Sequence, residues 1–195
     1  MAGILVRLTN QTEDARSMPK DMTQPETRTP VLRKPEATDG AAIWELVRAC
    51  KPLDENSMYC NLVQAEHFRD TCVVAELDGE PVGWISGHMI PNQDAFFVWQ
   101  VAVSPKARGL GLGRKMLTHL VERDECAEAT ELKTTITRDN DASWGLFRSF
   151  ARSIGGELSD EPHYTRDEHF DGMHATEHMV TIELPEEQEA LRAAA

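Results

Sequence analysis

Hydrophobic and polar positions along the chain predict four helices and six strands between residues 31 and 184. Val31–Arg33 is expected to form a short first strand. Thr38 or Asp39 is expected to cap the first helix, and Pro52 follows its end because proline cannot continue a helix. The apolar face of this helix consists of Ile43, Leu46, Val47 and Cys50. A polar loop and a second short helix are expected over residues 53–68.

Three β-rich runs follow, and the first two form a predicted hairpin. Thr71–Leu77 and Val82–Met89 are joined by Asp78-Gly79, a pair that favours the tight turn between antiparallel strands. The third run, Ala95–Val103, is nearly all apolar, which is typical of a strand covered on both faces. These runs therefore predict the buried centre of a sheet.

Helices and strands alternate in the remaining part of the pattern. Residues 132–137 and 179–184 predict two more strands, and Asn140 or Asp141 is expected to cap the helix between them. The apolar stripes of the two later helices are Leu112, Met116, Leu117, Leu120 and Val121, and then Trp144, Phe147 and Ala151. Three consecutive strands followed by alternation predict an α/β fold, with a mixed sheet and helices on both of its faces.

A glycine-rich turn links the third β-rich run to the next helix, with the sequence Arg108-Gly109-Leu110-Gly111-Leu112-Gly113. Glycines let the main chain approach a ligand with several N–H groups pointing inward, and a helix N-terminus adds partial positive charge. The turn therefore favours binding of a pyrophosphate. Its spacing is neither that of a P-loop nor that of the dinucleotide motif G-x-G-x-x-G.

The distribution of charge supports an anionic ligand at this turn. Residues 95–121 contain no Asp or Glu but four cations, which are Lys106, Arg108, Arg114 and Lys115. The alternative is that a buried strand within this window excludes acids in any case. Over the whole chain the formal net charge is −13 and the pI about 4.9, which argues against nucleic-acid binding and suits a salt-rich, halophilic cytoplasm.

The spacing Arg108-x-x-Gly111-x-Gly113, after an apolar strand and a proline-containing turn, resembles the signature of the GNAT N-acetyltransferases. The resemblance covers about residues 31–155. It implies the GNAT fold, whose mostly antiparallel sheet is splayed at its central strands, and acetyl-CoA as the cosubstrate without a metal. The residues it assigns to the coenzyme are Val101, Val103, Arg108, Gly109, Gly111, Gly113, Arg114 and Asn140. The main-chain N–H of Val101 is also expected to stabilise the oxyanion. Asn140 has an equally weighted alternative as an ordinary helix cap.

Two positions depart from the GNAT pattern. Many members carry a tyrosine as general acid where this chain has Phe147, and some carry a glutamate where it has Gln100. Because neither side chain transfers a proton, either another acid serves or the thiolate leaves unaided. A more distant carboxylate or a water chain would then take the proton of the incoming amine.

Four longer blocks of sequence resemble the diaminobutyrate acetyltransferases of ectoine biosynthesis. They are Pro52–Tyr59, Phe97–Val103, Thr134–Asn140 and Ala142–Phe147. This resemblance, over about residues 31–184, implies transfer of the acetyl group of acetyl-CoA to the γ-amine of L-2,4-diaminobutyrate. The alternatives are a GNAT enzyme for another small amine, such as a polyamine, and a non-catalytic acyl-CoA-binding sensor.

A pocket for this substrate needs acceptors for two ammonium groups and donors for one carboxylate. The expected pocket residues are Asp54, Asn56, Ser57, Tyr59, Trp99, Thr135, Thr137, His174 and Glu177. Trp99 is expected to form a wall with a cation–π contact, and Glu177 to bind or deprotonate the amine. Other interpretations stay open: Asp54 and Ser57 as helix caps, Trp99 as core, Thr135 as a strand former and Glu177 as a solvated acid.

Features outside these motifs point to an ordinary cytoplasmic protein. The four dispersed cysteines indicate reduced thiols, and no segment is apolar enough for a signal peptide or a membrane span. Four histidines between residues 163 and 178 suggest a metal site, but their spacing matches no standard ligand set. Residues 1–30 are expected to be a disordered arm and 185–195 a tail around one domain, 31–184. A homodimer is expected by analogy with small GNAT enzymes.

Overall fold

The computed structural model describes residues 29–51, 53 and 55–185. The expected arm falls almost wholly outside this part of the chain, as do most of the expected tail, Pro52 and Asp54. Within it, the four helices are α1 (Gly40–Ala49), α2 (Met58–His67), α3 (Leu112–Val121) and α4 (Asp141–Ile154). All four were predicted, three of them from the spacing of apolar residues and α2 as a short helix within residues 53–68.

The strands form one seven-stranded sheet in the order β1-β2-β3-β4-β5-β7-β6. Their bounds are β1 (Val31–Arg33), β2 (Val73–Leu77), β3 (Glu80–Met89), β4 (Ala95–Val103), β5 (Glu131–Thr137), β6 (Leu158–Tyr164) and β7 (Glu177–Glu183). The pairing of β4 with β5 is parallel and every other pairing is antiparallel. The mixed, mostly antiparallel sheet was predicted correctly. The hairpin at Asp78-Gly79 was too, and both of its residues have positive φ, 54° and 83°.

The prediction of six strands was wrong, because β6 is a seventh. Its residues, Leu158–Tyr164, are almost all exposed, and Pro162 lies within it. The strand is an edge strand that pairs with β7 alone, and an edge tolerates proline because one side of its backbone has no ladder. Nothing in its own polarity pattern marks it as a strand, since neither face is buried.

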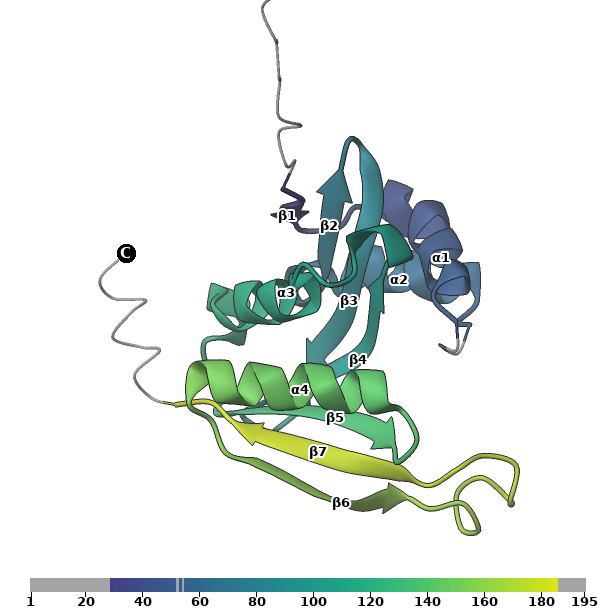
Figure 1. Ribbon diagram of the computed structural model, residues 1–195, viewed down its shortest axis with the longest axis vertical. Helices are drawn as coiled ribbons and strands as arrows, with labels where there is room; N and C mark the ends of the chain where they lie inside the picture. The colour runs from purple at the N-terminus through teal and green to yellow at the C-terminus, as the bar shows by residue number, and fades with distance from the viewer. Residues whose placement is uncertain (1–28, 52, 54, 186–195) are drawn as a thin grey trace, which may run out of the picture.

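Helices cover both faces of the sheet, as predicted (Figure 1). One core lies between the sheet and α3 with α4, and includes Phe96, Met116 and Phe150. A second, smaller core lies on the opposite face under α1 and α2, and includes Ile43, Val47 and Trp84. The second helical layer covers only the β2–β4 part, so no helix of the described residues covers the face of β5 and β7 that points away from α4.

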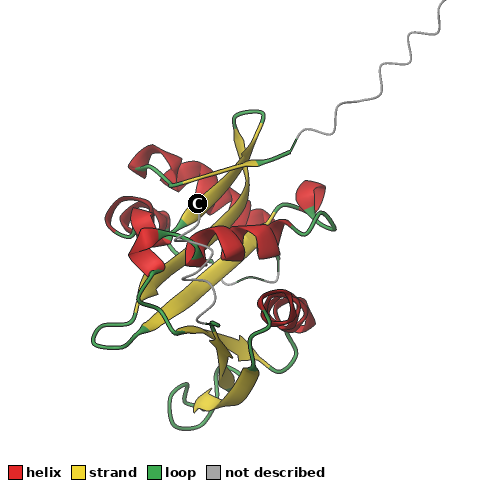
Figure 2. Ribbon diagram, turned by 90° about the vertical axis from the view of Figure 1, so that its left-hand side faces the viewer, coloured by secondary structure: helices red, strands yellow, loops and turns green. Residues whose placement is uncertain are grey.

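The sheet splits between β4 and β5. The two strands pair only at their beginnings, from Ala95 with Glu131 to Phe97 with Lys133. In Figures 1 and 2 the long antiparallel strands β3 and β4 lie along one axis, and the β5–β7 part of the sheet turns away from that axis. The remaining residues of β4 therefore face a splayed opening rather than a neighbouring strand.

A β-bulge in β4 lies at Trp99. Val98 pairs with Gly87 and Gln100 pairs with Ser86, which leaves Trp99 as the extra residue. On one side of it Phe96 and Val98 pack towards α3 and α4, and on the other side Val101 and Val103 do so. The bulge thus shifts the side-chain alternation by one residue, and it turns Trp99 outward with 53% of its surface exposed. The alternative interpretation of Trp99 as plain core is therefore wrong.

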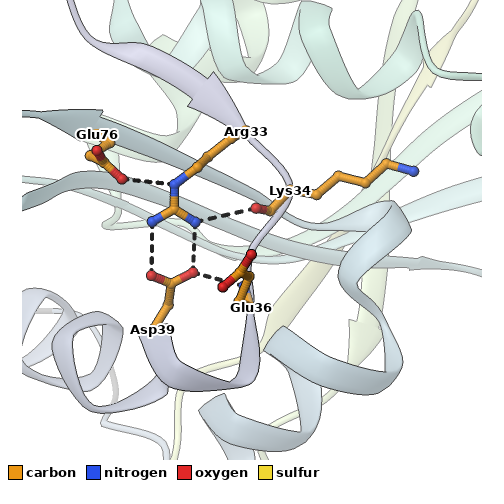
Figure 3. A network of polar contacts seen from close by, with 5 residues as sticks. All are labelled: Arg33, Lys34, Glu36, Asp39 and Glu76. Carbon is orange, nitrogen blue, oxygen red and sulfur yellow. Dashed lines mark hydrogen bonds and ion pairs between the residues drawn. The ribbon is translucent and has the colours of Figure 1, made fainter. Parts of the chain in front are cut away.

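Arg33 joins β1 to the start of α1 and to β2 (Figure 3). Its guanidinium forms two hydrogen bonds to Asp39, of 2.7 and 2.8 Å, and one to Glu76 of 2.8 Å. Asp39 is the N-cap residue of α1, one of the two positions predicted, but its side chain makes no capping hydrogen bond to the helix. Its carboxylate instead binds Arg33 and accepts a hydrogen bond from the N–H of Glu36.

Candidate active site at the splayed strands

The glycine-rich turn has the geometry of an anion site. Gly109 and Gly111 have φ of +77° and +67°, a conformation that glycine adopts without strain. Gly111 is the N-cap residue of α3 and offers no side chain, so no side-chain cap hydrogen bond occupies the first turn of the helix. The N–H groups of that turn and the helix dipole are therefore directed at the turn, where an anion would bind.

Gly113 has a different role from the other two glycines. It lies inside α3, and a Cβ placed on it would stand 3.1 Å from Leu146 Cδ1 in α4. Its absence of a side chain therefore lets α3 and α4 pack closely. The prediction that all three glycines allow the main chain to approach the ligand therefore holds for Gly109 and Gly111. Gly113 instead allows α3 to pack against α4, which fixes the position of the helix N-terminus.

The main chain of Val101 and Val103 points into the opening. Ser104 N donates to Val82 O at 2.8 Å, and in an antiparallel ladder bonded and non-bonded pairs alternate. Gly83–Val103 and Ile85–Val101 are therefore non-hydrogen-bonded pairs, whose N–H and C=O groups point away from β3. The carbonyl of Val103 accepts bonds of 3.3 Å from Cys50 Sγ and from Arg108 Nε, so Arg108 folds back under the turn. The N–H of Val101 therefore lies where an extended ligand in the opening would hydrogen-bond to β4.

Asn140 caps α4, and Phe147 is part of the core. Asn140 Oδ1 accepts a 3.1 Å hydrogen bond from the N–H of Ser143, so the helix-cap interpretation of this residue is confirmed. Phe147 is 2% exposed and packs in the larger core. The phenyl ring of Phe147 cannot donate a proton. This side chain contributes to the packing of the core instead.

The loop before α2 is held against β4. Asn56 Nδ2 donates to Gln100 Oε1 at 3.4 Å, and the carbonyl of Asn56 accepts from Trp44 Nε1 at 3.1 Å. Ser57 caps α2 by accepting from Cys60 N at 3.1 Å, so its interpretation as a cap is confirmed. Tyr59 is 75% exposed on the first turn of α2. The structure therefore brings Asn56 beside the central strand and leaves Tyr59 on the surface.

Thr135, Thr137 and Glu177 share the uncovered face of β5 and β7. Thr137 lies directly opposite Glu177 in the ladder, and Thr135 lies opposite Met179. The Glu177 side chain is 19% exposed, and its Oε1 is 4.0 Å from Nδ1 of His174. The hydroxyl of Thr137 hydrogen-bonds Asp139 and thereby lowers the pKa of that carboxyl. A carboxylate, an imidazole and two hydroxyls thus gather on one side of the opening.

The thiols are poor candidates for a nucleophile. All four cysteines are free. Burial raises the pKa of Cys50 in spite of nearby Arg108, and burial raises the pKa of Cys72 to about 12. A thiol with a raised pKa is mostly protonated at neutral pH and is not nucleophilic. The geometry therefore favours direct transfer between two bound substrates.

Two further negative findings concern the described residues alone. Among them, no three His, Cys, Asp or Glu side chains gather in an arrangement that would hold a metal ion. No helix in the same part of the chain is long and apolar enough to span a membrane.

Some polar residues near the opening were missed from the sequence. Asn61 and Gln64 on α2 are buried, with 0% and 3% of their surface exposed. Ser86 on β3 is also buried, with 1% exposed. Asn61 and Gln64 lie three residues apart on α2 and share its buried stripe with Ala65, but polar side chains at this spacing do not by themselves indicate burial.

The splay between two neighbouring parallel strands, with an anion-binding turn after the first, defines an acyl-CoA-dependent transferase site. The acetyltransferase (GNAT) family model matches residues 40–151, and the chain belongs to that family. This agrees with the resemblance seen in the sequence.

Within the family, two similar curated proteins share one printed name. The L-2,4-diaminobutyric acid acetyltransferase of Vibrio cholerae serotype O1 is 46% identical over 79% of this chain and 90% of its own length. The protein of the same name from Halomonas elongata is 46% identical over 77% of this chain and 79% of its own.

A solved structure extends this likeness to the fold. The diaminobutyrate acetyltransferase EctA of Paenibacillus lautus, in complex with L-2,4-diaminobutyric acid and coenzyme A, is 37% identical with a TM-score of 0.76. The match covers 80% of this chain and 95% of that one. The acetyltransferase yncA of Salmonella typhimurium, at 22% identity and a TM-score of 0.59, shares the fold.

Proposed function

We propose that this chain transfers the acetyl group of acetyl-CoA to the γ-amine of L-2,4-diaminobutyrate, the step that supplies N-γ-acetyl-diaminobutyrate for ectoine synthesis. The observation that carries the proposal is the 46% identity over 79% of the chain to a relative of that name. The solved structure with diaminobutyric acid and coenzyme A at 37% identity supports the same substrates.

The coenzyme would be held by β4 and the turn that follows it. Arg108, Gly109, Gly111 and the first turn of α3 with Arg114 would bind the pyrophosphate, while the main chain of Val101 and Val103 would pair with the pantetheine arm. The bound thioester supplies an activated acetyl group. The N–H of Val101 would donate to the oxygen that becomes negative as the carbonyl is attacked.

The acceptor would lie between the α1–α2 loop and the uncovered face of β5 and β7. Its two ammonium groups need anionic or carbonyl partners, and Glu177 with the exposed ring of Trp99 would provide them. Asp54, Asn56, Ser57, Tyr59, Thr135, Thr137 and His174 complete the proposed pocket. With Phe147 in the core, the thiolate would leave without a proton from that position, which is tolerable for a thiol of pKa about 8.5.

We also propose a homodimer in the cytoplasm. The β6–β7 hairpin projects from the rest of the described chain in Figure 1, with Tyr164 43% and Met173 86% exposed near its tip. Exposed large apolar side chains on a projecting hairpin favour a protein contact. Light scattering on the purified protein measures the oligomeric state, and a monomer at micromolar concentration would reject the dimer.

The function is tested by comparing acceptor amines. Thiol release from acetyl-CoA is measured with diaminobutyrate, ornithine and spermidine, and NMR of the product assigns the acetylated nitrogen. We expect diaminobutyrate to give the highest kcat/KM and the γ-amide as product. A preference for spermidine would favour a polyamine enzyme. Tight acetyl-CoA binding without turnover of any amine would favour a sensor.

A further inference from the structure

The loop that joins β6 to β7, residues 165–176, is braced by Arg166. The N–H of Arg166 donates to Thr176 Oγ1 at 3.1 Å, at the base of the loop. Further along, Arg166 Nε donates to Gly172 O at 3.1 Å, and the carbonyl of Arg166 accepts from the N–H of Gly172 at 2.8 Å. A loop of this length without internal bonds would sample many conformations. These three bonds therefore favour a single shape of the loop.

A tight turn within this loop brings two aromatic rings together. Asp171 and Gly172 have φ of +47° and +78°, and the N–H of Met173 donates to Phe170 O at 2.8 Å. The chain thereby reverses between Phe170 and His174, whose ring centroids lie 4.7 Å apart at an interplanar angle of 47°. This distance lies in the range typical of attractive aromatic pairs. The turn thus packs the Phe170 ring on the imidazole of His174.

The imidazole of His174 is held by a hydrogen bond as well. Its Nδ1 is 2.8 Å from the carbonyl oxygen of Ala175. Because a carbonyl only accepts hydrogen bonds, Nδ1 carries the hydrogen in this contact. The same nitrogen lies 4.0 Å from Glu177 Oε1. The ring of Phe170 and the carbonyl of Ala175 together therefore fix the orientation in which His174 meets Glu177.

The exposure of these side chains shows why the contact with Phe170 matters. The His174 side chain is 36% exposed, so burial alone does not hold it in one rotamer. The Glu177 side chain beside it is 19% exposed and faces the splayed opening. Tyr164 supports Phe170 in turn, with ring centroids 6.5 Å apart. A row of three rings thus runs from the end of β6 to the carboxylate at the start of β7.

We propose that Phe170 is a positioning residue for the acetyl transfer: its ring holds the His174 imidazole against Glu177 and so orients the carboxylate toward the acceptor amine. This inference rests on the proposed function, in which Glu177 binds or deprotonates that amine. Phe170 acts through His174 and needs no contact with either substrate. Small displacements of a reacting group cost much of the rate, so a ring outside the pocket controls turnover in this way.

The first test removes the ring and keeps an apolar side chain. We expect Phe170→Leu to lower kcat about tenfold while KM for acetyl-CoA stays within about twofold, because the glycine-rich turn is unaffected. Phe170→Tyr retains the ring and should keep at least about half of the wild-type kcat. Met173→Leu, at an 86% exposed position of the same loop, is the matched control. A wild-type kcat for Phe170→Leu would overturn the proposal.

A double-mutant cycle separates positioning from stability. If Phe170 acts through His174, the loss from Phe170→Leu should shrink to less than about twofold in a His174→Gln background. Equal losses in both backgrounds would overturn the proposal and assign Phe170 to the stability of the loop or to a contact with a partner. Light scattering on Phe170→Leu distinguishes those two roles, since only a partner contact changes the oligomeric state. A wild-type kcat for His174→Gln would also overturn the proposal.

A third measurement depends neither on these variants folding nor on the substrate. In NMR spectra of the wild-type protein, a nuclear Overhauser effect should connect the ring protons of Phe170 with those of His174. Its absence would overturn the inference even with diaminobutyrate as the substrate. If wild-type turnover identifies another amine, the cycle is measured with that amine, so a failed substrate assignment and a failed positioning role give different results.

Discussion

At the scale of single residues, Glu177 is the proposed acid–base group that its surroundings favour most. It is mostly buried, faces the opening and lies opposite Thr137. Glu177→Gln keeps the shape and removes the negative charge, so we expect kcat with diaminobutyrate to fall about 10²–10⁴-fold. Acetyl-CoA affinity, measured by calorimetry, should stay unchanged. Glu183→Gln, an exposed acid on the same strand, is the control. A wild-type rate for Glu177→Gln would remove this residue from the mechanism.

Gly111 allows a separate test of the anion-binding turn. A valine at its φ of +67° is strained, and the turn must rearrange. We expect Gly111→Val to abolish measurable acetyl-CoA binding in calorimetry. Gly79→Val introduces similar strain at φ +83° in the β2–β3 hairpin, away from the turn, and should bind acetyl-CoA as the wild type does. Equal loss in both variants would mean that the effect is one of stability and not of the site.

At the scale of elements, the Arg33 network gives stability that depends on pH. Arg33 holds the pKa of Asp39 below its usual value, chiefly by hydrogen bonding. The folded pKa is depressed, so this stabilisation is complete above the unfolded pKa of about 3.9 and is lost as pH falls through the folded pKa. Because the Arg33 side chain is 33% exposed, we expect Arg33→Met to lower the free energy of unfolding by only about 1–2 kcal/mol at pH 7.

Urea unfolding at a series of pH values measures this effect. The difference in unfolding free energy between wild type and Arg33→Met should be largest near pH 6–7 and shrink below about pH 3. Lys34→Met, at the residue that follows β1, is a control, since within the described residues Lys34 pairs only with the exposed carboxylates of Asp70, at 2.8 Å, and Glu125. A difference for Arg33→Met that persists at low pH would assign its effect to packing.

The elements differ in how far their own residues predict them. Leu112–Val121 and Asp141–Ile154 bury apolar stripes, so the spacing of apolar residues was enough to find them. Leu158–Tyr164 becomes a strand only because β7 pairs with it, which no local pattern reports. The bulge at Trp99 was hidden for a related reason. In a strand buried on both faces, apolar residues do not reveal where the alternation shifts.

The residues of the candidate site also differ in whether the sequence alone could predict them. The turn from Arg108 to Gly113 was predictable because the main chain itself forms the site. The buried stripe of Asn61 and Gln64 was not recognised, since burial of polar residues on a helix depends on what that helix packs against. The pairing of Thr137 with Glu177 joins segments 40 residues apart in sequence. Only the register of β5 and β7 brings them together.

At the scale of the whole molecule, the net charge of −13 makes stability depend on salt. Self-repulsion among exposed acids opposes the compact state, and screening shortens from about 10 Å at 0.1 M salt to about 3 Å at 1 M. Exposed ion pairs such as Lys34–Asp70 weaken at the same time, but each contributes little. Repulsion therefore dominates, and we expect the Tm to rise by roughly 3–6 °C from 0.05 to 1 M NaCl, about 1–2 kcal/mol.

A charge-reduced variant separates screening from general salt effects. Glu66→Gln, Glu80→Gln and Glu157→Gln together remove three negative charges from exposed positions. By calorimetry, this variant should have a higher Tm than wild type at 0.05 M NaCl and a smaller rise towards 1 M. Sucrose raises the Tm of both proteins equally, because an uncharged osmolyte stabilises without screening. If the Tm of wild type instead fell with NaCl, the attractive pairs would outweigh the repulsion, and the acidic surface would have to be explained by something other than tolerance of salt.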